Sequence, residues 1–377
     1  MKKIKTDFLI IGSGFYGSVL AERISSILKK KVTILEKRDH IGGNCYSEHD
    51  KTTNIEYHKY GSHIFHTFNK KVWNYINNFT SFNSYKHQVL TSFNNKIYQM
   101  PINLETINSF FDKNFSPAEA EKFINKISKQ FKKNEYNNFE EKALSQIGEE
   151  LYLAFIKNYT EKQWNDSPKN LHASIFNRLP LRFNYNEDYF KNCIWQGIPQ
   201  DGYTDVFNRL LNNKRIQLIH ETYELKNQYD VKYMTIYTGP LDKLFNYKLG
   251  ELKWRSLSFK KKIISLKDYQ GTSVINYPEK KYKFTRIHEP KHLHTDRKYS
   301  HNKTLIIHEY PKTSSNEPYY PVNDYKNRSL HRKYKSMALK IPKFDIGGRL
   351  ADYAYYDMDM TISAALQKFE KIEKNFK

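Results

Sequence analysis

Apolar and polar residues alternate near the amino-terminal end of the chain in an order that predicts strand, helix and strand. The mostly apolar run Asp7–Ile11 predicts a short buried strand, and Val32–Leu35 predicts a second one. Between these runs, Ser18–Leu28 carries apolar residues at helical spacing. The three segments together predict one βαβ unit.

A helical region follows farther along the chain. Over Leu104–Leu153 the pattern is helical, and the stretches Ala118–Gln130 and Glu140–Tyr152 carry apolar residues three and four positions apart. Because this region separates the βαβ unit from later strand-like segments, we expect it to be a helical insertion.

The second half of the chain is rich in aromatic and β-branched residues. Runs at Lys232–Tyr237, Gly271–Tyr277 and Thr304–Tyr310 predict the strands of a sheet domain. Near the carboxyl end, Phe344–Ile346 predicts another strand, and Met358–Phe369 predicts an amphipathic helix. We expect this last strand and helix to return to the first domain.

Three glycines follow the first predicted strand and open the first predicted helix. Gly12 allows a tight turn, Gly14 lets backbone N–H groups approach a pyrophosphate, and Gly17 permits close helix packing. Glu36 ends the second strand, where a carboxylate accepts hydrogen bonds from the ribose of a dinucleotide. A second glycine pair, in Gly42–Asn44, is typical of FAD proteins rather than simple NAD dehydrogenases. The pattern predicts FAD, and the alternative is a structural turn with a coincidental acid.

The chain carries a formal net charge of +22, which raises the question of an anionic partner. Its lysines are spread along the whole chain, as on a solvated surface, and no nucleic-acid-binding signature accompanies them. We therefore expect no nucleic-acid partner, although binding to nucleic acid or an anionic surface is the alternative that charge alone supports. No run of about 20 apolar residues is present, so no membrane span is expected.

Cys45 and Cys193 are the only cysteines, which excludes a disulfide framework and a tetrathiolate metal site. Such a chain is expected in the reducing cytoplasm. The sequence has neither a second dinucleotide fingerprint nor a CxxxxC pair, either of which would indicate a reductase with its own NAD(P)H domain. Electrons for the flavin would have to come from an external reductant such as NAD(P)H.

Seven ordered segments give the chain a resemblance to a known family. They are Glu36–Asn44, Lys59–Thr67, Tyr159–Trp164, Gln196–Thr204, Tyr237–Pro240, Glu317–Asp324 and Gly347–Asp357. With these segments the chain resembles the bacterial UDP-galactopyranose mutases over nearly its whole length. Chance agreement across all of them in the same order is negligible.

The resemblance implies an α/β fold in which a Rossmann-type FAD-binding domain carries an inserted helical bundle and an antiparallel β-sheet domain. The FAD-binding domain is expected at residues 1–80, about 198–250 and 325–377. The helical insertion is expected at about 98–176. The sheet forms a substrate domain, expected at about 81–97, 177–197 and 251–324.

The resemblance also implies a reaction. Members of the family interconvert UDP-galactopyranose and UDP-galactofuranose without net redox change, through a covalent adduct between the sugar and N5 of reduced FAD. Such an isomerase, an intramolecular transferase, supplies galactofuranose for cell-surface polysaccharides and is typically a homodimer. Two alternatives stay open: an amine-oxidase-like FAD-dependent oxidoreductase, and a mutase that prefers UDP-N-acetylgalactopyranose.

Three residues match positions with catalytic roles in the family. Arg178 and Arg286 match two diphosphate-binding arginines, whose forked guanidinium groups stabilise charge on the leaving diphosphate. His63 matches a histidine on the flavin side, near the sugar. Residues 166–180 match a mobile loop that carries Arg178 over the nucleotide and excludes water.

Other side chains match substrate and cofactor contacts of the family. Tyr159 resembles the uracil-stacking ring, and Arg349 resembles a residue that contacts the flavin. The expected substrate-binding residues are Tyr159, Thr160, Trp164, Arg178, Tyr189, Arg286, Tyr320, Tyr355, Asp357 and His87. The expected cofactor-binding residues are Gly12, Gly14, Phe15, Gly17, Glu36, Lys37, Gly43, Asn44, His63, Arg349, Tyr355, Asp357 and Met358.

Three positions depart from the residues usual in the family. His87 stands where Asn is common, Ile156 stands where a stacking Phe can occur, and Trp195 replaces a frequent Tyr. We expect these changes to affect which UDP sugar is preferred and to leave the core chemistry untouched.

A metal site is another interpretation of part of this sequence. His58, His63 and His66 lie close together in the chain, and imidazole is a common metal ligand. Glu56 is the only acid nearby, so no metal is expected.

Overall fold

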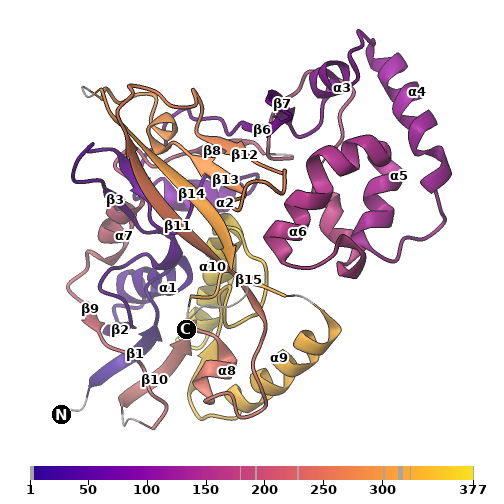
Figure 1. The fold of residues 1–377 in the computed structure, drawn as a ribbon. Coiled ribbons are helices and arrows are strands. Elements are labelled where there is room, and N and C mark those ends of the chain that lie inside the picture. Colours follow the sequence, from indigo (N-terminus) through magenta and orange to yellow (C-terminus); the bar gives the residue numbers. More distant parts are fainter. Residues whose placement is uncertain are drawn as a thin grey trace.

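Two large sheets organise the fold, as Figure 1 shows. A computed structural model describes residues 4–178, 180–191, 193–226, 229–299, 302–312, 317–322 and 324–376, and the side chains of residues 177 and 178 lie outside this description. The first sheet is parallel, with the strand order β16-β10-β1-β2-β9. The strands span Phe344–Ile346 (β16), Asp230–Tyr237 (β10), Lys5–Ile11 (β1), Val32–Glu36 (β2) and Ile216–His220 (β9).

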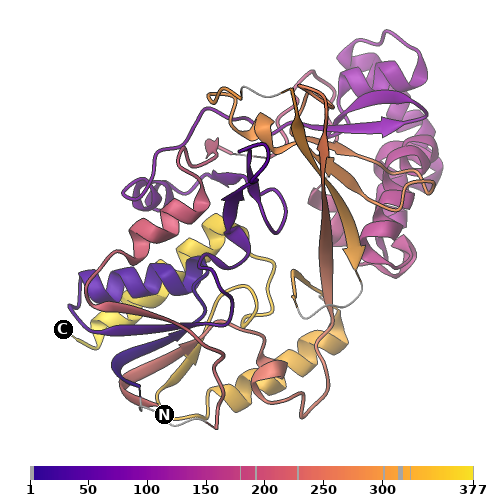
Figure 2. The ribbon, with the colours of Figure 1, turned by 60° about the vertical axis from the view of Figure 1, so that its left-hand side comes forward.

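Helices cover both faces of the parallel sheet (Figure 2). They include α1 (Phe15–Ser26), α10 (Met358–Lys374), α8 (Leu241–Leu244) and α9 (Tyr325–Ala338). Phe8 and Ile10 of β1 are buried in the core with α1 and α10, whereas Leu9 and Ile11 are buried in the core with α8 and α9. Because side chains alternate along a strand, one apolar run fills both cores. The predicted βαβ unit and the α/β fold class are confirmed.

The second sheet lies between the parallel sheet and the helical region in both views (Figures 1 and 2). Its strand order is β15-β11-β14-β13-β12-β6-β7. The strands span Tyr320–Pro321 (β15), Trp254–Ile264 (β11), Thr304–Lys312 (β14), Arg286–His288 (β13), Val274–Asn276 (β12), Val89–Phe93 (β6) and Lys96–Met100 (β7). All its pairings are antiparallel except β6 with β12, which is parallel. The long connection between β6 and β12 allows either direction, so a strand pattern alone does not reveal this exception.

One predicted strand belongs to the other sheet. Lys232–Tyr237 falls in β10, which pairs with β1 in the parallel sheet. The runs Gly271–Tyr277 and Thr304–Tyr310 contribute β12 and β14 to the second sheet. Grouping all three in one sheet domain is therefore wrong, because buried parallel and antiparallel strands share the same apolar, β-branched composition.

A helical region projects from the second sheet (Figure 1). It contains α3 (Leu104–Phe111), α4 (Pro117–Ser128), α5 (Phe139–Leu151), a π-helical turn at Tyr152–Lys157 and α6 (Asn158–Trp164). Asn103 caps the first of these helices, and Ser116 and Glu119 form a capping box on the second. Apolar residues of the helices share a core with Val89 and Tyr98, which anchors the region on β6 and β7.

Short elements complete the described chain. β3 (Ser47–His49) pairs with β4 (Glu56–His58), and β5 (Phe65–Thr67) pairs with β8 (Trp195–Gly197). Further helices are α2 (Lys70–Ile76) and α7 (Tyr203–Leu211), with 3₁₀ turns at Gly43–Cys45, Lys129–Phe131, Pro168–Asn170, Ala173–Arg178 and Pro290–Leu293. Within the described ranges, none of the helices has the length and apolar character needed to span a membrane.

Candidate active site

The glycine turn joins β1 to α1. At two of its three glycines, a residue with a side chain would not fit. Gly12 has a φ of +102°, a conformation that favours glycine. A Cβ at Gly17 would lie 2.0 Å from the carbonyl oxygen of Gly12. The first and third glycines of the motif are therefore required by the turn itself.

Gly14 has a different role, because it faces open space. It caps α1, and an added Cβ would meet no atom within 4 Å. The first turn of α1 contains no acidic residue, so the free N–H groups and the helix dipole favour a bound anion. A cradle of this kind fits the pyrophosphate of a dinucleotide.

A cavity of about 850 Å³ extends from this turn. The predicted cofactor-binding residues that line it are Gly12, Gly14, Phe15, Gly17, Glu36, Lys37, Gly43, Asn44, His63, Arg349 and Met358. Of the other two, Tyr355 lines a neighbouring cavity, and a carboxylate oxygen of Asp357 lies 4.0 Å from Nε2 of His66. The residues lining this cavity fit an extended cofactor such as FAD.

Glu36 holds the glycine turn as well as lining the cavity. One carboxylate oxygen accepts hydrogen bonds from the N–H and the hydroxyl of Ser13, at 2.9 and 2.7 Å. The other accepts from the N–H of Arg38 at 3.0 Å. The protein therefore orients this carboxylate itself, and its remaining lone pairs are available to a ribose.

Arg38 and Glu317 also line the cofactor cavity, although the sequence prediction omits them. Arg38 donates a hydrogen bond to the side-chain oxygen of Asn44 at 2.9 Å and forms an ion pair with Glu317. Lys37 pairs with the same carboxylate at 3.2 Å. Arg38 and Glu317 are 279 residues apart in the chain, so their pairing cannot be predicted from local sequence. Each lies in one of the family-like segments, which was the one available indication that they belong to the site.

His63 lines the cofactor cavity as a neutral imidazole. Its Nδ1 lies 2.6 Å from the carbonyl oxygen of Gly61, which can only accept, so Nδ1 carries the proton. Burial and the charge of Arg349 lower the pKa of His63 to about 4. At neutral pH, Nε2 is therefore an unprotonated hydrogen-bond acceptor.

The three clustered histidines make separate contacts. Nδ1 of His58 accepts a hydrogen bond from the backbone N–H of His63 at 2.9 Å. His66 stacks on Phe190, with 3.6 Å between ring centroids. These contacts give each imidazole a structural partner of its own.

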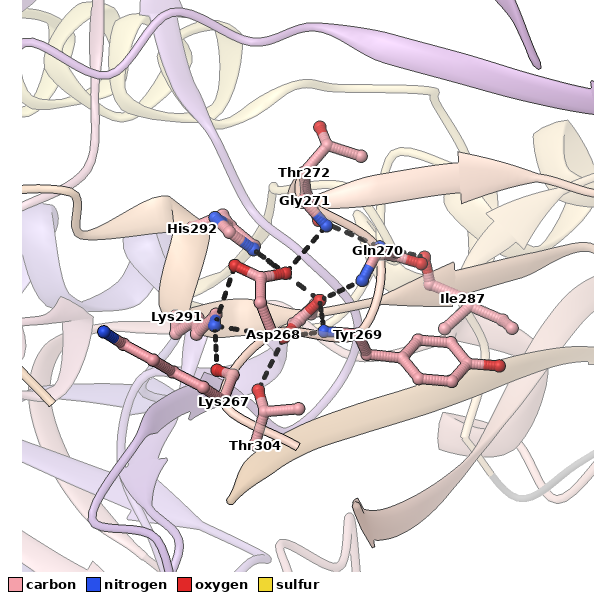
Figure 3. Close-up of polar contacts among 11 residues, drawn as sticks. Lys267, Asp268, Tyr269, Gln270, Gly271, Thr272, Ile287, Lys291, His292 and Thr304 are labelled. Carbon is pink, nitrogen blue, oxygen red and sulfur yellow. Dashed lines mark hydrogen bonds and ion pairs between the residues drawn. The ribbon is translucent and has the colours of Figure 1, made fainter. Parts of the chain in front are cut away.

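Within the described residues, metal-ligand spacing occurs in a different cluster, formed by Asp268, Glu289 and His292 (Figure 3). Lys291 already places its ammonium there, 2.9 Å from Asp268 and 3.4 Å from Glu289. Glu289 also accepts hydrogen bonds from the N–H of Gln270 and the hydroxyl of Thr304, at 2.8 and 2.6 Å. The lysine supplies the positive charge, so the cluster is a structural ion pair that fixes the turn before β12.

A second cavity, of about 870 Å³, is lined by residues of α6 and the second sheet, and we call it the substrate cleft. The predicted substrate-binding residues that line it are Tyr159, Thr160, Trp164, Tyr189, Arg286 and Tyr355. Tyr320 stacks on Tyr355 with ring centroids 5.1 Å apart, and the His87 ring lies 5.1 Å from that of Tyr189. The side chain of Arg178 lies outside the described residues.

Arg286 begins β13 and is oriented by two neighbours that the sequence did not predict. Its Nε donates to the side-chain oxygen of Asn276 at 3.1 Å, and Nη1 lies 3.5 Å from a carboxylate oxygen of Glu309. His288 contacts the other oxygen of Glu309 at 2.9 Å. Burial favours the neutral form of this acid, but Arg286 and His288 outweigh it and lower the pKa of Glu309 to about 2. Glu309 could have been suspected from the sequence, because it is a charged residue within the otherwise largely apolar run Thr304–Tyr310.

Arg349 lies between the two cavities. Its guanidinium carbon is 5.6 Å from the ring centroid of Tyr320 and 5.7 Å from that of Tyr355. Its Nε donates a hydrogen bond to the carbonyl oxygen of Tyr356 at 2.9 Å. Arg349 lines the cofactor cavity, while Tyr355 lines the substrate cleft. One side chain therefore links the two.

Tyr159 brings a buried hydroxyl to the cleft. No hydrogen-bond partner for this hydroxyl is present in the described part of the chain. The guanidinium of Arg286 lies 5.8 Å from the centroid of its ring. A buried polar group without a partner costs about 1–3 kcal/mol, so a ligand oxygen that accepts from Tyr159 would be favoured.

Of the three departures from the usual family residues, one lines the cleft and a second packs against a residue that does. Burial and the charge of Arg286 lower the pKa of His87 to about 3, and its Nδ1 is 3.0 Å from the Tyr85 hydroxyl. Ile156 is buried and lines the cleft. Trp195 instead stacks on Trp73, with ring centroids 5.8 Å apart.

Comparisons with known proteins identify the family. A UDP-galactopyranose mutase profile matches residues 154–355, and a profile of the NAD(P)-binding Rossmann-like domain matches residues 10–79. A probable UDP-galactopyranose mutase of Klebsiella pneumoniae is 39% identical over 96% of this chain and 93% of its own length. The chain belongs to the UDP-galactopyranose mutase family. The resemblance inferred from the seven segments is thus confirmed, and family membership supports FAD as the cofactor.

Other relatives place the family membership in context. A dTDP-fucopyranose mutase of Escherichia coli is 38% identical over 98% of this chain and 99% of its own. A UDP-galactopyranose mutase of Mycoplasma genitalium is 34% identical over 97% and 94%. The crystal structure of a reduced UDP-galactopyranose mutase covers 98% of this chain with a TM-score of 0.75, over 94% of its own length. At 13% identity that structure supports the fold alone.

Proposed function

We propose that this enzyme interconverts UDP-galactopyranose and UDP-galactofuranose on reduced FAD, with no net redox change. The observation that carries the proposal is the contact of Arg349 with Tyr320 and Tyr355. This contact joins the cofactor cavity to a cleft lined by arginines and phenols, as a diphosphate requires. A nucleotide sugar bound across the junction would bring its sugar to the flavin and its diphosphate to the cleft.

The residues of the cofactor cavity have distinct proposed tasks. The glycine turn and the start of α1 hold the pyrophosphate, and Glu36 holds the ribose. His63, Arg349 and Met358 line the cavity where they would hold the flavin. When bound and reduced, FAD supplies the nucleophile for the sugar. His63 offers a neutral acceptor there and adds no charge to the site.

Arg286 carries the main electrostatic task in the proposal. Negative charge grows on the diphosphate as its bond to the sugar breaks, and a guanidinium fixed in advance stabilises that charge. Asn276 and Glu309 hold Arg286 in place, so little reorganisation is needed. The phenols add donors without charge, which lets UDP be held and then returned to the sugar. Arg178, on the loop 166–180, is proposed as the second arginine.

A second candidate substrate is dTDP-fucopyranose, the sugar in the name of the Escherichia coli relative. It has a diphosphate as UDP-galactopyranose does, and it differs at the base and at the sugar substituents. The Arg286 group would therefore hold either nucleotide. UDP-N-acetylgalactopyranose is a further alternative, because this chain departs from the usual family pattern at Ile156, which lines the cleft, and at His87, which packs against Tyr189 of the cleft.

The deciding experiment is an isomerisation assay with the reduced enzyme. UDP-galactofuranose, dTDP-fucofuranose and UDP-N-acetylgalactofuranose are compared at equal concentration, with reductant consumption followed in parallel. We expect UDP-galactopyranose to form without consumption of reductant. A higher kcat/KM on another nucleotide sugar would reassign the substrate. An oxidised product formed with stoichiometric consumption of O₂ or another electron acceptor would favour the amine-oxidase-like oxidoreductase instead.

We also propose a cellular setting, in which the enzyme acts in the cytoplasm as a homodimer. NAD(P)H reduces its flavin, and the galactofuranose enters cell-surface polysaccharide. The two free cysteines support a reducing compartment, and family membership supports the other statements. Light scattering tests the dimer, and anaerobic reduction by NADH or NADPH tests the electron donor.

A further inference from the structure

Lys162 lies in a cage of backbone carbonyl oxygens beside the substrate cleft. Its Nζ donates to the carbonyl oxygens of Tyr277, Glu279, Tyr282 and Phe284, at 2.5, 3.2, 3.1 and 3.0 Å. An ammonium has three N–H donors, so these acceptors must share them. All the acceptors lie in the loop between β12 and β13, whereas Lys162 lies in α6.

The caged loop connects two strand residues that line the substrate cleft, Asn276 and Arg286. β12 ends at Asn276 and β13 begins at Arg286, and these two residues are paired in the sheet, so residues 277–285 form the connection that closes this pair. α6 lines the cleft through Tyr159, which lies one helical turn before Lys162 and whose ring is 5.8 Å from Arg286. Lys162 thus joins the two elements that place Arg286 and Tyr159.

We propose that Lys162 is a positioning residue whose ammonium acts as a built-in cation, tying the β12–β13 loop to α6 and so holding Arg286 in place. This inference rests on the proposed function, because Arg286 is given its task there. Among the described ion pairs Lys162 has no carboxylate partner, and one carboxylate oxygen of Glu279 pairs with Lys281 at 3.0 Å.

The carbonyl oxygens, together with the nearby charge of Glu279, compensate the partly buried charge of Lys162. Burial lowers the pKa of Lys162 to about 8, so the ammonium still predominates at neutral pH. Carbonyl dipoles that converge on one point favour a cation there. A lysine that only packed its methylene groups could keep its ammonium in water instead of placing it among these carbonyl oxygens.

The cage predicts a monovalent cation site once the lysine is removed. Converging carbonyl oxygens are the ligands that replace water around K⁺ in selectivity filters. Lys162→Ala takes away the ammonium and leaves the oxygens, whereas Lys162→Met keeps an uncharged chain in the same space. We expect K⁺ to replace the ammonium in the first variant and not in the second.

The kinetic experiment compares these variants in LiCl and in KCl. In LiCl, Lys162→Ala should lose about 10²-fold in kcat/KM, the loss that a misplaced catalytic group causes. The loss should fall mainly on kcat, because Arg286 acts on charge that develops during reaction. KCl should restore most of it, and Lys281→Ala, which removes an exposed ammonium from the same loop, should behave as wild type in both salts.

Thermal melting tests whether a cation occupies the carbonyl cage, and this test does not depend on catalysis. K⁺ relative to Li⁺ should raise the Tm of Lys162→Ala and leave those of the wild type and Lys162→Met unchanged. If the wild type isomerises no sugar, the proposed function fails, while this melting test of the cage still stands. Wild-type kinetics of Lys162→Ala in LiCl would overturn the inference, as would a loss that neither K⁺ nor NH₄⁺ restores.

If Lys162→Ala does not fold, a second variant, Lys162→Gln, can test the inference instead. Lys162→Gln keeps an amide donor on a shorter side chain, so it should show a smaller loss of kcat and no response to K⁺. Unchanged kcat and KM in Lys162→Gln would overturn the inference.

Discussion

At the scale of single residues, the substrate cleft depends on charges that the protein orients before any ligand arrives. Arg286 is held by Asn276 and by the buried carboxylate of Glu309. Burying such a pair costs desolvation free energy, and the pair is weak evidence for stability. Its value here is orientation, because a guanidinium already aimed at the cleft need not reorganise during reaction.

Arg286→Ala should leave FAD bound and lower kcat by about 10²–10³-fold, because one donor to the developing charge is lost. Arg178→Ala should have an effect of the same order. Steady-state kinetics, with flavin absorbance as the measure of cofactor content, test both variants. Arg209→Ala is the matched control, since Arg209 of α7 is paired with Asp201 and Asp205 and lines neither cavity. Near-normal turnover in both variants would remove these arginines from the mechanism.

Glu309 should give the protein a pH-dependent stability. Its pKa is lowered to about 2 in the folded chain, against about 4.3 when unfolded, so its stabilisation is present above the unfolded pKa. That stabilisation is lost as the pH falls through this window toward 2. Glu309→Ala should cost about 3–5 kcal/mol at pH 7, because Arg286 and His288 lose their partner.

Urea unfolding of the wild type and Glu309→Ala, measured from pH 7 downward, tests this prediction. The difference in unfolding free energy should be constant above pH 5 and shrink below it. Glu370→Ala removes an exposed carboxylate paired with Lys71 and should change little at any pH. A difference that grows on acidification would contradict the assigned charge of Glu309.

At the scale of elements, the junction of β1 and α1 separates the structural tasks of the glycines from the binding task. Gly17 has no room for a side chain, whereas Gly14 has an extended conformation, φ −68° and ψ 178°, that alanine can adopt. The two positions therefore allow folding and cofactor binding to be tested apart.

Gly14→Ala should fold with the wild-type Tm in the absence of flavin yet bind FAD weakly, because its Cβ fills the space proposed for the pyrophosphate. Gly17→Ala should lower the Tm itself, since its Cβ would lie 2.0 Å from the Gly12 carbonyl oxygen. Calorimetry of the flavin-free proteins and titration with FAD measure the two effects. Normal FAD affinity in Gly14→Ala would place the pyrophosphate elsewhere.

The same elements show what a sequence can predict. The βαβ unit was predicted because its strand, turn and helix are consecutive, and each glycine has a local steric reason. The partners of Arg286 were not, because Asn276 and Glu309 reach it through the pairings β12–β13 and β13–β14. The Lys162 cage was not predicted for another reason. Its acceptors are backbone carbonyl oxygens, which every residue type has, so the sequence does not reveal them.

At the scale of the whole molecule, the cofactor cavity gathers segments from both ends of the chain. The glycine turn lies near the start of the sequence, and Glu317 and Arg349 lie near its end. Tyr237 ends β10, which lies between these segments in the sequence. The seven family-like segments named many of these residues, but not the ion pair that joins Arg38 to Glu317. A ligand that contacts all these segments should act on the stability of the entire protein.

FAD should therefore raise the melting temperature of the flavin-free protein. A ligand that binds only the folded state stabilises it by about 2.7 kcal/mol at a hundredfold excess over Kd. FMN should raise the Tm less than FAD does, because it lacks the adenosine half that would contact Glu36 and the pyrophosphate cradle. Scanning calorimetry of the stripped protein with each flavin measures the shift, with Gly14→Ala as the control whose Tm should rise much less because it binds FAD weakly. An equal shift with FMN and FAD would show that the adenosine side of the cavity contributes nothing. A Tm indifferent to both would remove the glycine turn from cofactor binding, because a cavity bounded by such distant segments cannot take up a ligand without restraining them.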